Sequence, residues 1–181
     1  HLLARKAARK ALIEWEDLPA ILTIDDAMAA ESWYEPPYVM ARGDADAALE
    51  AAPRVIEGVM EIGAQEHFYL ESQAALAIPG EDGDVTLHCS SQHPTEIQHK
   101  VAEALGEPFH SVTVEVRRMG GGFGGKESQG NALACICAIA AKRLKRPVKI
   151  RYDRDDDMTI TGKRHDFRIA YRVGIDDDGR I

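Results

Sequence analysis

The sequence predicts an α+β fold in which helices pack against a mixed sheet. Apolar residues make up 45% of the chain and charged residues 29%, which is ordinary for a globular protein. Stretches that alternate apolar and polar residues, typical of strands, are interspersed with stretches of helical period. Proline and glycine separate these stretches at short intervals. We therefore expect a mixed α/β arrangement of short elements without an internal repeat.

The beginning of the chain reads as three elements: a helix over residues 2–15, a strand over 18–24 and a short helix over 25–32. The helical pattern is already under way at His1, with no initiator Met and no capping residue before it. We expect residues 1–30 to be the C-terminal end of a preceding α/β subdomain in a longer polypeptide.

A linker is predicted at residues 31–50. Pro36 and Pro37 lack the N–H that a helix or sheet would use, and proline biases the residue before it towards extended backbone. We expect the residues after the linker, 51–181, to be the N-terminal part of a second, incomplete domain.

The second domain reads as strands over residues 54–63, 67–79, 84–90, 111–116, 148–152 and 166–175, and helices over 94–106, 131–141 and 153–161. Pro94 suits the first turn of a helix and Gly106 suits its end. Residues 131–141, NALACICAIAA, are apolar on all sides, which predicts a buried helix. Pro147 should end the basic stretch that follows.

Charge and cysteine content argue against several classes of protein. The net charge of −8 is spread along the chain and leaves no basic stripe for a nucleic acid. No apolar run approaches the ~20 residues of a membrane helix. Cys89, Cys135 and Cys137 lack the spacing of a zinc or iron–sulfur site. We expect them to be buried, reduced thiols of a cytoplasmic protein.

Five glycines occupy the six positions 120–125, between a predicted strand and a predicted helix. Glycine lets backbone approach a ligand closely, and a helix N-terminus attracts anions. A nucleotide-hydrolase phosphate loop needs Ser or Thr after its lysine, where this sequence has Glu127. A dinucleotide-binding loop is an alternative, although Asp153 lies farther along than the ~20 residues of that fingerprint. A tight turn that serves packing alone is another.

Further polar residues are candidates for function. Glu127 is either an acid in the first turn of a helix or a carboxylate that accepts hydrogen bonds from a substrate. In EIGAQEHFYLE, residues 61–71, Gln65 has an amide that can donate to a ligand oxygen, while His67 favours a structural role. Three consecutive acids, 155–157, fan out at a helix start, which predicts surface acids that offset the helix dipole rather than a cation site.

With RMGGGFGGKESQGN and EIGAQEHFYLE in one chain, the sequence resembles the xanthine dehydrogenase/aldehyde oxidase family of molybdenum hydroxylases. The resemblance continues through SSQHPTEIQHKVAEALG and RYDRDDDMTITGKRHDF, so it covers essentially the whole chain. It is strongest to the molybdopterin-binding subunit of bacterial members. It implies that residues 51–181 begin a molybdopterin-binding domain, in which a mixed sheet carries packed helices.

The resemblance also implies which residues form the site. The residues that would line the molybdenum–molybdopterin cofactor are Gln65, Gly121, Gly122, Phe123 and Gly124. The Gln65 amide, helped by the Phe123 backbone, would contact the apical oxo ligand of the metal. Glu127 would face the substrate and favours a purine, because many aldehyde-oxidising members have an apolar residue there. Ala64 departs from the family's pattern, which has a second glycine before this glutamine.

The implied parent enzyme hydroxylates hypoxanthine and xanthine to urate, with an aldehyde-oxidising enzyme as the alternative. Its electrons would pass to NAD through 2Fe–2S clusters and FAD that other regions or subunits hold. The family's catalytic glutamate and a substrate-binding arginine have no match in residues 1–181. We therefore expect no catalytic residue in this chain and no activity from it alone.

Overall fold

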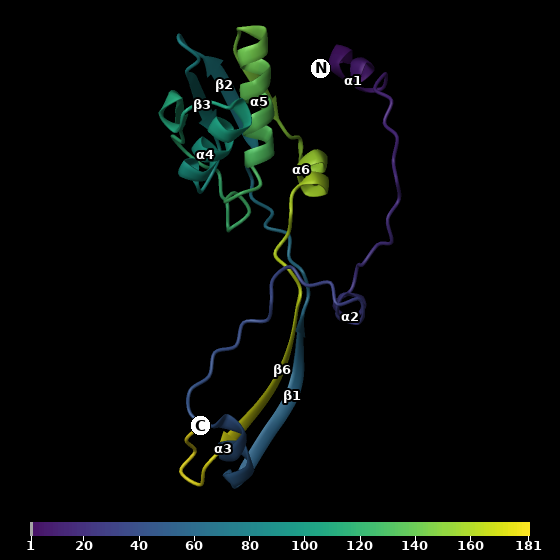
Figure 1. Cartoon of the computed structure of the whole chain (residues 1–181), viewed down its shortest axis with the longest axis vertical. Coiled ribbons are helices and arrows are strands. Elements are labelled where there is room, and N and C mark those ends of the chain that lie inside the picture. The colour runs from purple at the N-terminus through teal and green to yellow at the C-terminus, as the bar shows by residue number, and fades with distance from the viewer. Residues whose placement is uncertain (1) are drawn as a thin grey trace. The chain divides into compact units, whose positions relative to one another are not determined.

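A computed structural model describes residues 2–181, which form two compact units (Figure 1). Unit 1 comprises residues 2–58 and Ala170–Ile181, and unit 2 comprises Val59–Ile169. The boundary passes through strands β1 (Arg54–Ile62) and β6 (Phe167–Ile175), which pair as a two-stranded sheet. No helix among residues 2–181 is long and apolar enough to cross a membrane.

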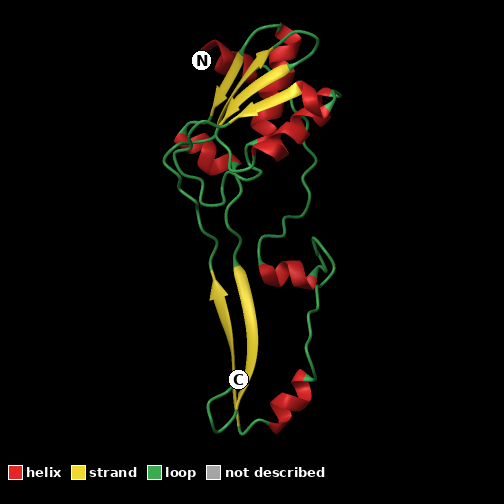
Figure 2. Ribbon diagram, turned by 90° about the vertical axis from the view of Figure 1, so that its left-hand side faces the viewer, coloured by secondary structure: helices red, strands yellow, loops and turns green. Residues whose placement is uncertain are grey.

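Unit 2 is built on a four-stranded mixed sheet (Figure 2). Its strands are β2 (Ala74–Pro79), β3 (Val85–Cys89), β4 (Val112–Glu115) and β5 (Val148–Arg151). The order is β4-β3-β2-β5, in which β3 runs parallel to β4 and β2 runs antiparallel to both of its neighbours. Leu87 of β3 lies opposite Ala77 of β2 and Val114 of β4. The mixed sheet confirms the predicted fold class.

Helices α4 (Pro94–Leu105) and α5 (Asn131–Leu144) pack on one face of this sheet and against each other. Period-two alternation points the apolar side chains of the strands to that face. The buried core consists of Ala75, Ala77, Val85, Leu87, Ile97, Val101, Ala102, Val112, Leu133, Ala134, Cys137, Ala138 and Ala141. Burial of these side chains is the main force that holds unit 2 together.

The predicted ends of these helices are largely confirmed. Pro94 lies in the first turn of α4, and Gly106 ends that helix with a left-handed φ of 65°. Lys145 ends α5 in the same way. The prediction that α5 is buried on all sides was wrong, because Ile136 is 54% and Ile139 44% exposed. In the part of the chain that the structure describes, α5 packs against the sheet on one side only, so its outward-facing side chains stay exposed.

One predicted strand is shorter than expected. Residues 67–73 form a loop, and the strand begins only at Ala74. Phe68 has a φ of 49°, which a strand cannot accommodate. Unit 2 also contains a short 3-10 helix, Phe109–Ser111, and helix α6 (Arg154–Ile160). The predicted short helix at residues 153–161 is thereby confirmed, with Asp153 as its N-cap.

Unit 1 has less regular structure than predicted. Its helices are α1 (Leu2–Ala8), α2 (Ile24–Ala29) and α3 (Ala45–Ala51). The predicted helix over 2–15 stops at Ala8, and the strand over 18–24 does not form. Helix α3 occupies the end of the predicted linker and extends one residue beyond it. None of these helices has a buried residue, and short helices depend on a packed face for stability. The division at residues 30 and 50 into parts of two domains stays a prediction.

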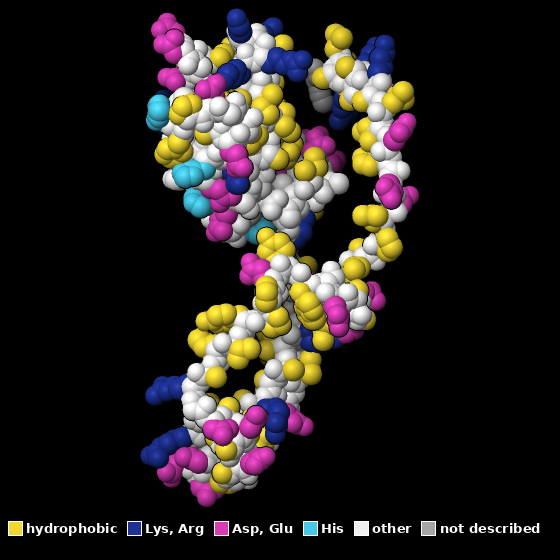
Figure 3. Space-filling model, in the orientation of Figure 1, with side chains coloured by type: hydrophobic (Ala, Val, Ile, Leu, Met, Phe, Trp, Pro, Cys, Tyr) yellow, Lys and Arg dark blue, Asp and Glu magenta, His cyan; other side chains and the backbone are white. Residues whose placement is uncertain are grey.

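Large apolar side chains are exposed along unit 1 (Figure 3). Leu12, Trp15 and Tyr34 are 98%, 80% and 100% exposed. Exposed apolar surface of this extent is typical of segments that pack against other protein. This accounts for the poor agreement between pattern and structure in unit 1, since the apolar positions there lack a partner within residues 2–181.

Candidate functional site

The glycine loop, Gly120–Gly125, lies in unit 2 between β4 and α5. It does not open the helix, because residues 126–130 separate it from Asn131, where α5 begins. The expectation that the loop leads directly into the N-terminus of this helix was therefore wrong. Glu127 is exposed and lies outside the helix, whose first turn contains no acid. The interpretation of Glu127 as an acid that offsets the helix dipole is excluded as well.

Two of the glycines are required by backbone conformation. Gly121 and Gly124 have φ values of +92° and +89°, which L side chains rarely adopt. Phe123 between them also has a positive φ, 52°, and its side chain is 75% exposed. A bulky residue in this conformation is strained and persists only where its surroundings hold it. Such strain is commonly found at ligand sites.

Other glycines are required by close contact. A Cβ on Gly122 would lie 2.5 Å from Oε1 of Gln92. A Cβ on Gly125 would lie 2.7 Å from Cγ of His67 and 2.7 Å from Cε1 of Tyr69. The glycine loop is therefore packed directly against the segment that contains Gln65, and the structure brings the two predicted motifs together.

Gln92 holds the second half of the loop. Its Oε1 accepts hydrogen bonds from the N–H of Gly124 at 3.0 Å and of Lys126 at 3.2 Å. Its own N–H donates to the Lys126 carbonyl at 2.8 Å. Sequence reasoning missed this residue, although it lies in the SSQHP stretch that carries part of the family resemblance. Nothing in local periodicity marks a contact between positions so far apart in the chain.

A buried network of polar side chains supports the glycine loop. The Gln73 amide donates to the Gly125 carbonyl at 3.0 Å and to the Tyr69 hydroxyl at 3.1 Å. Asp157 accepts from the Tyr69 hydroxyl and from the Gln73 N–H, both at 2.6 Å. Burial, together with the hydrogen bond to Asp157, raises the pKa of Tyr69. The network fixes the loop to α6.

The position of Asp157 corrects the prediction that all three acids at 155–157 lie on the surface. It is 1% exposed, whereas Asp155 and Asp156 are exposed as expected. Helical spacing places one of three adjacent residues on the packed face, so the three acids do not share one role. Among residues 2–181, no group of three or more His, Cys, Asp or Glu side chains is placed to hold a metal ion.

Gln65 lies in the segment, residues 61–71, that packs beside the glycine loop. Its backbone forms a bridge with Arg164 through two N–H to carbonyl bonds of 3.1 Å. Its side chain is exposed, and the amide donates only to the neighbouring Glu66 carbonyl at 3.3 Å. Glu66 is an ion-pair partner of Lys163 at 2.7 Å. Burial alone would raise the pKa of Glu66, but Lys163 and the Phe68 N–H lower it.

Three successive N–H groups of the loop are free. Within residues 2–181, the N–H groups of Gly121, Gly122 and Phe123 donate no hydrogen bond, whereas those of Gly120 and Gly124 are both used. Successive backbone N–H groups without an internal acceptor are able to bind an anion or oxygen atoms. The amide of Gln65 and the N–H of Phe123 are donors rather than metal ligands. They could therefore contact an oxygen ligand of a metal, not the metal itself.

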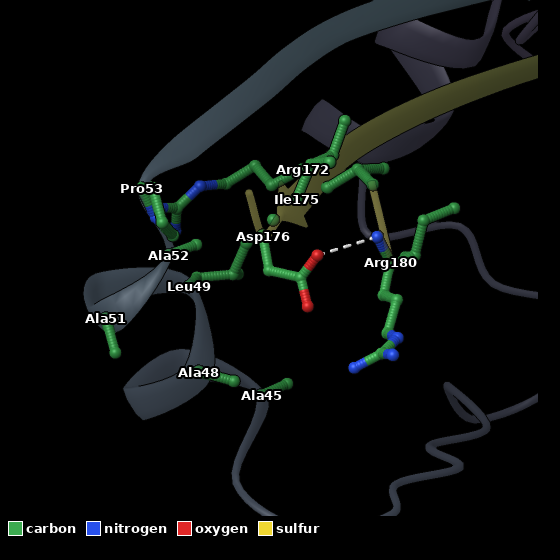
Figure 4. A pocket seen from close by; sticks show the side chains of 13 residues that line it. Ala45, Ala48, Leu49, Ala51, Ala52, Pro53, Arg172, Ile175, Asp176 and Arg180 are labelled. Carbon is green, nitrogen blue, oxygen red and sulfur yellow. Dashed lines mark hydrogen bonds between the residues drawn. The ribbon is translucent and has the colours of Figure 1, made fainter. Parts of the chain in front are cut away.

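A separate hollow lies in unit 1, between α3 and the end of β6 (Figure 4). It has a volume of about 480 Å³ and is lined mainly by apolar side chains, such as Ala48 and Leu49. Asp176 at its edge accepts the Arg180 N–H at 2.8 Å and stabilises a turn. None of the predicted site residues lines it, so the glycine loop is the stronger candidate.

The sheet topology excludes the dinucleotide alternative. Helix α5 joins β4 to β5, which occupy opposite edges of the sheet with β3 and the antiparallel β2 between them. In a dinucleotide-binding unit, by contrast, the glycine turn opens the helix directly, and the helix leads to a neighbouring parallel strand. Asp153 accepts the Asp156 N–H as the N-cap of α6.

The fold, together with a glycine loop that has free backbone donors, indicates a ligand-binding domain of the cofactor-binding class. The sequence model of the family described as the molybdopterin cofactor-binding domain matches residues 30–181. The chain therefore belongs to this family. Molybdenum–molybdopterin is accordingly its cofactor class, and the resemblance to the xanthine dehydrogenase/aldehyde oxidase family is confirmed.

Known proteins resemble the chain along its whole length. The xanthine dehydrogenase of Drosophila pseudoobscura pseudoobscura is 45% identical over 181 residues, 99% of this chain and 14% of the fly protein. That of Emericella nidulans is 43% identical over 98% of this chain and 13% of its own length. The structure of aldehyde oxidoreductase from Desulfovibrio gigas matches with a TM-score of 0.81 and 28% identity, over 98% of this chain and 20% of that one. The chain therefore spans about one seventh of the length of the curated relatives.

Proposed function

We propose that this chain forms one wall of the molybdopterin site of an enzyme that hydroxylates purines, with hypoxanthine and xanthine as substrates and urate as product. The observation that carries the proposal is the row of free N–H groups from Gly121 to Phe123, packed beside the Gln65 segment. These donors suit a cofactor that is rich in oxygen and nitrogen acceptors. The bound cofactor would supply the oxygen-transfer and electron-accepting chemistry, and the chain would orient it.

Each predicted site residue has a role in this proposal. Gly121, Gly122 and Gly124 let the backbone approach the cofactor without a Cβ. The Phe123 N–H and the Gln65 amide would hold the oxygen-bearing part of the cofactor as hydrogen-bond donors. Both groups are uncharged, so they would bind an acceptor there without adding charge to the site.

Glu127 favours a purine substrate. Its side chain is exposed immediately after the loop and makes no hydrogen bond or ion pair within residues 2–181. A carboxylate in this place can accept hydrogen bonds from the ring N–H groups of a purine. The relatives named xanthine dehydrogenase support the same choice.

The remaining parts of the active site would come from outside this chain. We infer that the catalytic glutamate and a substrate-binding arginine belong to the rest of the molybdopterin subunit. The 2Fe–2S clusters and FAD would lie in other regions or in a partner subunit and carry electrons to NAD. A cytoplasmic location fits these cofactors and stays a prediction. We expect residues 1–181 alone to show no purine turnover.

An aldehyde-oxidising enzyme is the second candidate, supported by the likeness to the Desulfovibrio gigas aldehyde oxidoreductase. The two candidates differ in what they require of Glu127. Aromatic aldehydes lack the ring N–H groups of a purine, so their oxidation does not need this carboxylate.

Glu127→Ala in the full-length protein tests the proposal. We expect kcat/KM for xanthine to fall on the order of 10²–10³-fold per bound molybdenum, the effect of losing one well-placed polar group in a dry site. Oxidation of an aromatic aldehyde should fall much less. Glu81→Ala, at an exposed turn between β2 and β3, is the control and should change neither rate. Equal losses with both substrates would contradict a purine site at Glu127.

A further inference from the structure

One carboxylate oxygen receives three hydrogen bonds beside the glycine loop. Oε2 of Glu71 accepts from the Ser90 hydroxyl at 2.5 Å, the Gly120 N–H at 2.8 Å and the Lys126 ammonium at 3.0 Å. The Glu71 N–H also donates to the Gly120 carbonyl at 3.1 Å. The residue that begins the loop is thus bound through both of its backbone groups to Glu71.

The residue after the loop binds the same oxygen. Lys126 is fully buried, although lysine is rarely buried unless it is paired. Its ammonium donates to the Ser90 hydroxyl at 2.7 Å and lies 4.7 Å from the centre of the Tyr69 ring. The carboxylate, hydroxyl and ring together compensate the buried charge. The two ends of the glycine loop are therefore tied to a single atom.

A loop with this composition needs such a tie. Glycine loses more backbone freedom on ordering than any other residue, so five glycines in six positions leave the free loop many conformations. A site works only when its groups are held close to the productive geometry. The free N–H groups lie between the two tied ends, which fixes where they can point.

We propose that Glu71 and Lys126 are positioning residues that set the place at which Gly121–Phe123 present their N–H groups to the cofactor. This inference rests on the proposed function of the loop. The alternative is that the pair only stabilises the fold of unit 2. The two roles predict different results when both charges are removed together. A pair that only stabilises the fold needs its charges balanced, so the double replacement should be tolerated. A pair that positions the loop needs its hydrogen bonds, which the double replacement removes.

The test compares four variants of the full-length protein: Lys126→Met, Glu71→Gln, the double variant and Lys100→Met. Met keeps the length of the lysine side chain and Gln keeps the shape of the glutamate. Lys100→Met is the matched control, since Lys100 pairs with Glu103 at 3.2 Å on the exposed face of α4. The measurements are molybdenum per polypeptide, melting temperature, and kcat and KM for xanthine per bound molybdenum.

We expect Lys126→Met to lower the melting temperature and the molybdenum content, and to lower kcat about 10–100-fold, the range for residues that orient a bound metal group. KM should stay close to that of the wild type, because the loop holds the cofactor rather than the substrate. The double variant should recover the melting temperature but not kcat. The control should match the wild type in every measurement.

Recovery of kcat together with melting temperature in the double variant would overturn the inference, as would an unchanged kcat in Lys126→Met. If the charge variants do not fold, Ser90→Ala decides, since it removes one hydroxyl from the cluster and no charge. A lower kcat with a normal melting temperature supports positioning, and an unchanged kcat overturns it. Absence of molybdenum from the wild type would instead refute the proposed function.

Discussion

The hydroxyl of Tyr69 donates a 2.6 Å hydrogen bond to Oδ1 of Asp157, and both residues are 1% exposed. This bond joins helix α6 to the segment that packs under the glycine loop. The other oxygen of Asp157 accepts the Gln73 N–H, so the carboxylate has two buried donors to satisfy. The geometry of the loop therefore depends on a residue that lies outside both site motifs.

Replacing Asp157 with Ala should destabilise unit 2 by about 2–4 kcal/mol, because it leaves two buried donors without an acceptor. Asp155→Ala is the matched control: its side chain is exposed, so the change should stay within about 1 kcal/mol, the usual size of a helix-dipole effect. Calorimetric melting of the full-length variants measures both. Equal melting temperatures for the two variants would contradict a structural role for Asp157.

Gly125→Ala should destabilise the loop by about 1–3 kcal/mol, the usual cost of overpacking. The new Cβ would lie 2.7 Å from ring atoms of His67 and Tyr69, and the Tyr69 ring cannot move without disturbing the buried network. At Gly63 a Cβ would meet nothing within 4 Å, so Gly63→Ala should be neutral. Resistance to proteolysis, followed at several temperatures, compares the two. A Gly125→Ala variant as resistant as Gly63→Ala would show that the loop is loosely packed.

The stability of the fold should depend on pH through Glu71, whose carboxylate accepts hydrogen bonds from Ser90, Gly120 and Lys126. Burial works to raise the pKa of Glu71, but Ser90, the Gly120 N–H and Lys126 lower it below its ordinary value. A lowered pKa means that the ionised form is the one the fold stabilises. The contribution is therefore complete above the unfolded pKa of about 4.3 and is lost as pH falls through the lower folded value. The difference in melting temperature between wild type and Glu71→Gln should be constant from neutral pH to about pH 5 and shrink in more acidic buffer. A difference that does not change with pH would contradict this.

The three cysteines should be slow to react. Burial raises the pKa of the Cys89 thiol to about 11, and burial also raises the pKa values of Cys135 and Cys137. Since the thiolate is the reactive form, iodoacetamide at pH near 8 should label these residues much more slowly in the native than in the unfolded protein. Peptide mapping by mass spectrometry measures each site separately. Rapid labelling of native Cys89 would show that it is more accessible or more acidic than its surroundings indicate.

Local chemistry made much of unit 2 predictable. Pro94, Gly106 and the helical spacing of apolar residues between them mark α4 within one residue of its ends. The strands around it follow from alternation and short turns. Unit 1 was less predictable, because its apolar positions do not pack within residues 2–181 and so cannot impose the expected structure on their neighbours.

The candidate site was predictable only where chemistry is local. The glycines, Gln65 and Glu127 stand out in the sequence, and their proposed roles follow from family resemblance. Glu71, Gln92 and Asp157 could not be found in this way, because each contacts the loop or its support across a long stretch of chain. The burial of Lys126 could not be predicted from the sequence either, because it depends on partners that sequence spacing does not reveal.

The molybdenum content of the full-length protein tests the central claim most directly. Wild type and Gly63→Ala should both carry molybdenum with its pterin. Gly122→Ala should lose most of it while staying folded, because its Cβ would lie 2.5 Å from the Gln92 oxygen that holds Gly124 and Lys126. A wild-type protein without molybdenum, or a Gly122→Ala variant that binds as much as the wild type, would contradict the assignment of this loop as the cofactor site.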